Sequence, residues 1–108
     1  MKNIREADWK HLRQLKPVAL ERYCKRVLAE VAQTGADEQQ PAQERYLSTY
    51  KLIHERDGEL AMLFDNTKRS TAMEKILLLR RYGLFTDDEW TGFTEEIRSI
   101  FEPAKPRL

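Results

Sequence analysis

Residues 82–90 read Tyr-Gly-Leu-Phe-Thr-Asp-Asp-Glu-Trp, and this stretch fixes the end of one helix and the start of the next. Gly83 stands where a left-handed residue closes a helix. Thr86 and Glu89, three residues apart, form the pattern of a capping box, in which each side chain accepts a hydrogen bond from the other residue's backbone N–H. Acidic residues in the first turn suit the positive end of the second helix. The stretch therefore predicts a tight helical hairpin with Trp90 buried in it.

In the rest of the chain, glycine and proline occur where helices are expected to begin or end, which is typical of an all-α protein. Pro17 disfavours helical geometry in the residue before it, so we expect one helix to end there and another to begin. Asp57 and Gly58 interrupt an apolar stripe and predict a kink. The predicted fold is a single-domain all-α bundle of about five helices with a long third helix and a C-terminal helical hairpin. The expected helices span about residues 4–15, 17–33, 41–65, 70–82 and 87–101.

Length and composition limit the class of protein. A chain of 108 residues fits one domain, and we expect a helical domain over 1–102 followed by a short flexible tail at 103–108. The N-terminus has no apolar signal core, and the longest apolar run, Leu60–Phe64, is far too short to span a membrane. Cys24 is the only cysteine, which excludes an internal disulfide and suits a reducing compartment. A cytoplasmic location without membrane association is the expectation.

Charge alternates along the chain although the net charge is only +1. Residues 1–34 and 67–83 each carry +4, whereas residues 35–66 carry −4 and residues 84–108 carry −3. One interpretation is that neighbouring helices of opposite sign attract each other weakly. The other is that a basic face meets an acidic partner or RNA. The residues of that face are Lys68, Arg69, Lys75, Arg80 and Arg81, with Lys25 and Arg26 as further candidates.

Spacing patterns that carry chemistry are missing. A DNA-binding helix-turn-helix is not expected, because the helix over 87–101 has five acidic residues against Arg98 alone and would meet phosphates with like charge. Asp8 and His11 form a single three-residue pair, too little to predict a metal site. No serine or cysteine nucleophile motif and no Gly-rich phosphate loop occurs in the sequence. We therefore predict no enzyme activity, no metal and no cofactor.

Two single residues have structural interpretations. Asp57 falls on an apolar stripe, and a buried carboxylate needs a hydrogen bond or an ion pair, so we expect His54, Arg80 or Arg81 beside it. Cys24 lies on the apolar side of its helix and is expected to pack as a small apolar residue rather than to act as a reactive thiol.

Residues 73–101 resemble the short helix-turn-helix oligomerisation modules found at the ends of some bacterial proteins. In these modules an apolar helix, a Gly-apolar-apolar-Thr turn and an acidic-aromatic helix start recur. The matching residues here are Leu77, Leu79, Gly83, Leu84, Phe85, Thr86, Asp87, Asp88, Glu89 and Trp90. The resemblance covers about a quarter of the chain, and any capped hairpin shares most of it, so we assign no family.

The sequence favours a small non-enzymatic protein-interaction module, an adaptor or regulator that binds another protein or itself. The alternative is a nucleic-acid-associated factor that uses the basic helix over 70–82. Tyr46 and Tyr50 lie on the stripe of the long third helix, and if that helix projects they lack cover within the chain. A homodimer would cover them, whereas in the other arrangement the first helix folds back over the third.

Overall fold

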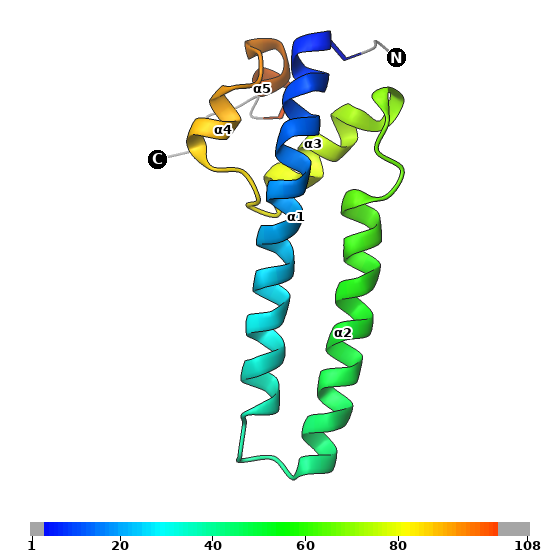
Figure 1. The fold of residues 1–108 in the computed structure, drawn as a ribbon, viewed down its shortest axis with the longest axis vertical. Coiled ribbons are helices and arrows are strands. Elements are labelled where there is room, and N and C mark those ends of the chain that lie inside the picture. The colour runs from blue at the N-terminus through cyan, green and yellow to red at the C-terminus, as the bar shows by residue number, and fades with distance from the viewer. Residues whose placement is uncertain (1–3, 102–108) are drawn as a thin grey trace. The chain divides into compact units, whose positions relative to one another are not determined.

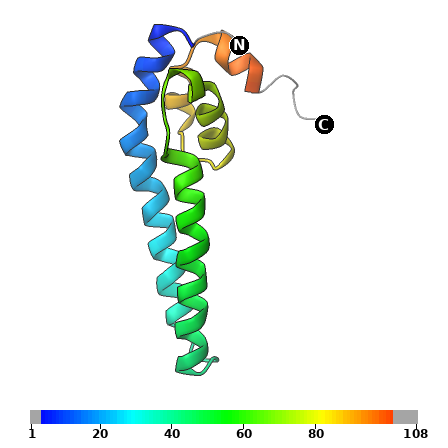
Figure 2. The same cartoon turned by 90° about the vertical axis from the view of Figure 1, so that its right-hand side faces the viewer.

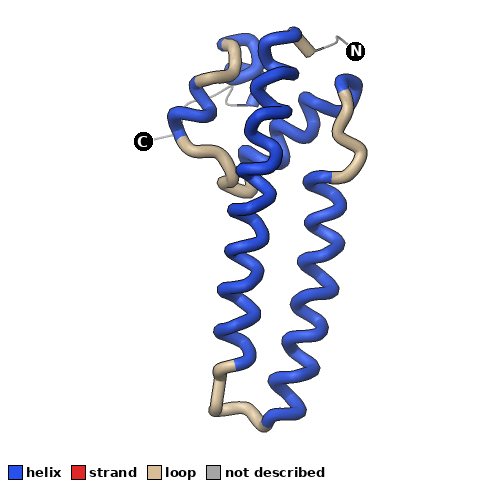
Figure 3. The backbone as a smooth tube through the Cα atoms, in the orientation of Figure 1, coloured by secondary structure: helices blue, strands red, loops and turns tan. Residues whose placement is uncertain are grey.

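A computed structural model describes residues 4–101, and all of its regular structure is helical (Figure 3). The all-α prediction is thereby confirmed. The elements are the α-helices α1 (Glu6–Gly35), α2 (Ala42–Phe64), α3 (Ala72–Arg81), α4 (Asp87–Thr91) and α5 (Glu95–Phe101) and the 3₁₀ helix η1 (Arg69–Thr71). They fall into two compact units. Among the described residues, the first consists of residues 4–19 and 66–101, and the second of Leu20–Asp65. The single-domain assignment of 1–102 stays a prediction, and the predicted tail at 103–108 lies outside the described residues.

Helix α1 is the longest element, with 30 residues against 23 in α2, so the predicted break at Pro17 is wrong. A proline inside a helix removes one N–H donor and crowds the carbonyl four residues earlier, here that of Arg13. Both Pro17 and Arg13 are exposed, so water can hydrate that carbonyl. Leu12 and Ala19 are fully buried at 0% exposure. Packing on the buried side of the helix therefore outweighs the local preference of proline.

The first unit has an aromatic core built around the predicted hairpin. Trp90 is buried as expected, and the ring centroids of Phe85, Trp90 and Phe93 lie 5.5 to 6.4 Å apart. Gly83 has a positive φ of 68°, and the backbone N–H of Leu84 donates to the carbonyl of Leu79 at 3.0 Å. This is the left-handed helix end that the sequence predicted.

The predicted capping box between Thr86 and Glu89 is also present. The backbone N–H of Glu89 donates to Oγ1 of Thr86 at 3.1 Å, and the backbone N–H of Thr86 donates to Oε1 of Glu89 at 2.9 Å. These two bonds satisfy donors that would otherwise be unpaired at the start of α4.

The single helix predicted over 87–101 is wrong, because it is divided into α4 and α5. Asp8 of α1 is 1% exposed, and its two carboxylate oxygens accept from the backbone N–H and the hydroxyl of Thr94, at 2.8 and 2.7 Å. His11 Nε2 donates to the carbonyl of Glu89 at 2.8 Å. A Cβ at Gly92 would overlap the His11 ring. Contacts from Asp8 and His11 of α1 thus stabilise the break between α4 and α5.

The second unit is an antiparallel hairpin, in which the part of α1 from Leu20 onward runs beside α2 (Figures 1 and 2). Helix α2 covers nearly the residues predicted for the third helix, but it is the second helix and is shorter than α1, so the prediction that the third helix is the longest element is wrong. The kink or short break predicted at Asp57 and Gly58 is wrong, because α2 is continuous through both residues and Figures 1 and 2 show it without a sharp bend. Asp57 is exposed and its side chain has no hydrogen bond or ion pair within residues 4–101, so its predicted basic partner is also wrong. A single exposed glycine costs only about 1 kcal/mol relative to alanine, which a 23-residue helix tolerates.

Candidate interaction surface

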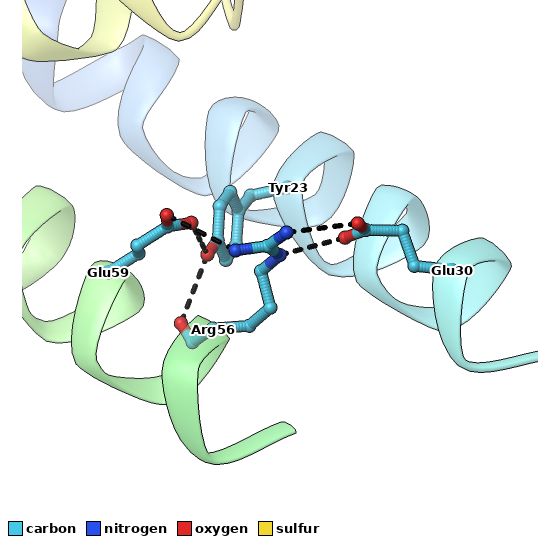
Figure 4. Close-up of polar contacts among 4 residues, drawn as sticks. All are labelled: Tyr23, Glu30, Arg56 and Glu59. Atoms are coloured by element: carbon cyan, nitrogen blue, oxygen red, sulfur yellow. Dashed lines mark hydrogen bonds and ion pairs between the residues drawn. The ribbon is translucent and has the colours of Figure 1, made fainter. Parts of the chain in front are cut away.

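A polar network holds α1 against α2 at the middle of the hairpin (Figure 4). The guanidinium of Arg56 donates through Nε and Nη2 to the two oxygens of Glu30, at 2.8 and 3.0 Å. Nη1 of Arg56 donates to Glu59 at 3.2 Å. The Tyr23 hydroxyl lies 3.0 Å from the carbonyl oxygen of Arg56 and 2.7 Å from Oε1 of Glu59. The network fixes the register of the two helices.

The hydrogen bonds between Arg56 and Glu30 also shift the pKa values of both side chains. The bond from Arg56 holds the pKa of Glu30 below its ordinary value. The bond to Glu30, and after it the nearby charges of Glu30 and Glu59, raise the pKa of Arg56. The cation therefore stays charged at any pH in which the protein is folded.

An apolar groove runs between the two helices of the hairpin. It encloses about 230 Å³. Its walls include Cys24, Val27 and Leu28 from α1 and Ile53, Asp57 and Leu60 from α2. Cys24 is half-buried in this wall.

Exposed apolar side chains extend the groove along α2. Tyr46 and Tyr50 are 70% and 64% exposed, and Ile53 is 48% exposed. Their spacing of four and three residues places them on one side of the helix. Leu28, across the groove, is 67% exposed. We call the surface formed by Cys24, Leu28, Tyr46, Tyr50, Ile53 and Leu60 the apolar face.

The basic residues predicted as a partner-binding face do not form one free surface. Arg69 pairs with Glu6 at 2.6 Å, and its guanidinium lies 5.6 Å from the ring centroid of Trp9. Arg80 lies 4.5 Å from the ring centroid of Trp90. The remaining three differ in exposure, since Lys75 is buried whereas Lys68 and Arg81 are exposed. Attraction between a cation and an aromatic ring places two of the five charges in contacts within the first unit.

A larger polar hollow of about 590 Å³ lies at the tip of the hairpin. Arg45 is one of the residues that line it, and Nη1 of Arg45 donates to the carbonyl of Gly35 at 2.9 Å. This bond satisfies one of the carbonyls left open at the end of α1. Nε of Arg45 is buried and has no hydrogen-bond partner among the described residues. Arg45 thus helps to close the end of α1.

Tyr46 and Tyr50 stay predicted partner-binding residues, whereas the polar network and the apolar groove were not predicted from the sequence. The signal for the network was Arg56, which lies four residues after Leu52 and seven before Leu63, at positions that face a neighbouring helix. A charged residue at such a position needs a partner across the seam. Within residues 4–101 no group of three or more His, Cys, Asp and Glu side chains is placed to hold a metal ion.

Comparison with known proteins finds no matching family model, no matching curated protein and no matching solved structure. The resemblance of residues 73–101 to short oligomerisation modules therefore gains no support from these comparisons. In the described part of the chain, no helix has the length and apolar character needed to cross a membrane.

Proposed function

We propose that this chain is a non-enzymatic protein-interaction module and that the apolar face of its hairpin docks amphipathic helices of a protein partner. The observation that carries the proposal is the continuity of the face. Exposed apolar residues of α2 lead directly into a groove whose other wall is α1. A contiguous exposed apolar surface of this kind typically marks a site of protein association.

The dimensions of the face favour a helix as its occupant. The distance along α2 from Tyr46 to Leu60 is about 21 Å, equal to roughly four helical turns. A groove between two helices accepts the side-chain ridges of a third. At about 230 Å³ the groove is smaller than the roughly 300 to 1,000 Å³ typical of small-molecule sites.

The nucleic-acid alternative has less support. The second unit carries nine acidic and six basic residues, which repels phosphate. In the first unit, Arg69 and Arg80 already make aromatic and acidic contacts. We therefore do not propose nucleic acid as the partner.

Site-specific photo-cross-linking tests the proposal. A benzoylphenylalanine in place of Ile53 is expected to give discrete protein adducts in the source cells, because residue 53 lies within the apolar face. The matched control is the same amino acid in place of Glu55, which is exposed and half a turn away around α2. Equal labelling at the two positions, or none at residue 53, would contradict the proposal.

A further inference from the structure

We infer that the occupant of the apolar face is the same face of a second copy of this chain, so that two hairpins form a four-helix bundle. The two-fold axis runs parallel to the hairpin, and α1 of each copy lies against α2 of the other. This inference rests on the proposed function and names its partner.

The exposed apolar area matches what one partner brings to a stable interface. Tyr46, Tyr50, Leu28 and Ile53, at their observed exposures, leave roughly 350 to 400 Å² of apolar surface open. One side of a standard protein interface buries roughly 800 Å², of which roughly 450 Å² is apolar. A self-complementary two-fold contact uses the same patch twice, so one face supplies both sides.

Asp57 identifies the kind of helix that the face accepts. Within residues 4–101 the Asp57 carboxylate has no hydrogen bond or ion pair, whereas the other charge in the groove wall, Arg56, is bound by Glu30 and Glu59. Covering the groove would desolvate Asp57 unless the incoming helix brought a cation. Lys25 of a second copy could supply this cation. Its side chain is exposed, and its contact with Glu21 is long at 3.9 Å.

The direction of the two-fold axis follows from the positions of Lys25 and Asp57 along the hairpin. Lys25 follows Cys24, and Cys24 lines the same groove as Asp57, so the two charges lie at about the same level. An axis parallel to the hairpin keeps that level and exchanges the helices, which brings Lys25 of each copy to Asp57 of the other. An axis across the hairpin, lying in the interface, would place α1 against α1 and Lys25 near Lys25. A single polar position in an apolar seam often fixes register in this way.

Two charge-reversed variants test this arrangement in the full chain. Lys25→Asp and Asp57→Lys each place like charges at both contacts of their own dimer, and each is expected to raise the dimer dissociation constant by about tenfold or more. When the two variants are mixed, both contacts of the mixed dimer join opposite charges. Sedimentation equilibrium of the mixture should therefore show a dimer close to wild-type strength.

Control variants separate this effect from general changes in charge. Lys51→Asp and Glu55→Lys reverse exposed charges on α2 away from the apolar face and should leave dimerisation unchanged, with helical content checked by circular dichroism. A wild-type monomer at 100 μM, or a mixture no stronger than the single variants, overturns the inference. If the purified protein is a monomer while residue 53 still cross-links a different protein, the second copy is wrong and the proposed function stands. If both experiments fail, both proposals fail.

Discussion

Asp8 is a buried acid whose two oxygens both serve Thr94, the residue before α5. Asp8→Ala would leave the N–H and hydroxyl of Thr94 without these acceptors, and a buried unpaired polar group costs about 1 to 3 kcal/mol. We expect Asp8→Ala to lower the free energy of unfolding by about 2 to 3 kcal/mol, with a smaller loss for Asp8→Asn, which keeps one acceptor oxygen. Chemical denaturation measures the loss, and an unchanged midpoint for Asp8→Ala would refute this role.

Gly92 lies against His11, which is three residues after Asp8 on α1. Gly92→Ala would normally favour a helix, but here the new Cβ overlaps the His11 ring. We expect a loss of about 1 to 3 kcal/mol in unfolding free energy from this overpacking. In the His11→Ala background the space is open, so Gly92→Ala should then cost little. A double-mutant cycle without coupling between the two positions would show that the overlap is relieved in another way.

At the scale of the elements, the pair between Glu30 and Arg56 makes the stability of the hairpin depend on pH. The folded state holds the pKa of Glu30 below its ordinary value of 4.5. The pair therefore contributes its full stabilisation above about pH 4.5, and this contribution is lost as pH falls through the lower pKa of the folded state. Glu30→Gln should be less stable than the wild type at pH 7, and the difference should shrink below pH 4.5. A difference that is constant from pH 7 to pH 3 would contradict the assignment.

The elements also show how much of the fold the sequence could predict. The joint at Gly83 and Thr86 was predictable because its donors and acceptors lie within a few residues of one another. The continuity of α1 through Pro17 depends on the burial of residues such as Leu12. Whether a residue is buried depends on the rest of the fold, so the sequence around Pro17 does not reveal it. The break before α5 depends on Asp8, which is 86 residues away from Thr94.

The candidate site likewise has features that the local sequence predicts and features that depend on distant contacts. Helical spacing placed Tyr46 and Tyr50 on one stripe but left open whether another helix covers them, and in the structure both are more than 60% exposed. The groove depends on pairing α1 with α2, and the pairing depends on the contact between Arg56 and Glu30, which are 26 residues apart. The partner-binding role of the five basic residues stays a prediction, and the contacts of Arg69 with Trp9 and of Arg80 with Trp90 could not be predicted because they form only in the folded chain.

At the scale of the whole molecule, association through the apolar face would couple stability to concentration. A dimer that dissociates on unfolding gains stability by mass action, so its melting temperature rises with protein concentration. We expect this rise for the wild type between about 1 and 100 μM. We expect it to vanish in the double variant Tyr46→Glu with Tyr50→Glu, because four buried carboxylates per dimer would oppose association.

Both tyrosines are more than 60% exposed within one chain, so the same changes should leave the stability of the monomer nearly unchanged. At the lowest concentration the double variant and the wild type should therefore melt close together, and they should separate as concentration rises. The variant Lys51→Glu with Glu55→Lys, which alters the same helix away from the apolar face, should follow the wild type throughout. Melting curves of the wild type that coincide at all concentrations would show that the apolar face does not join two copies of this chain.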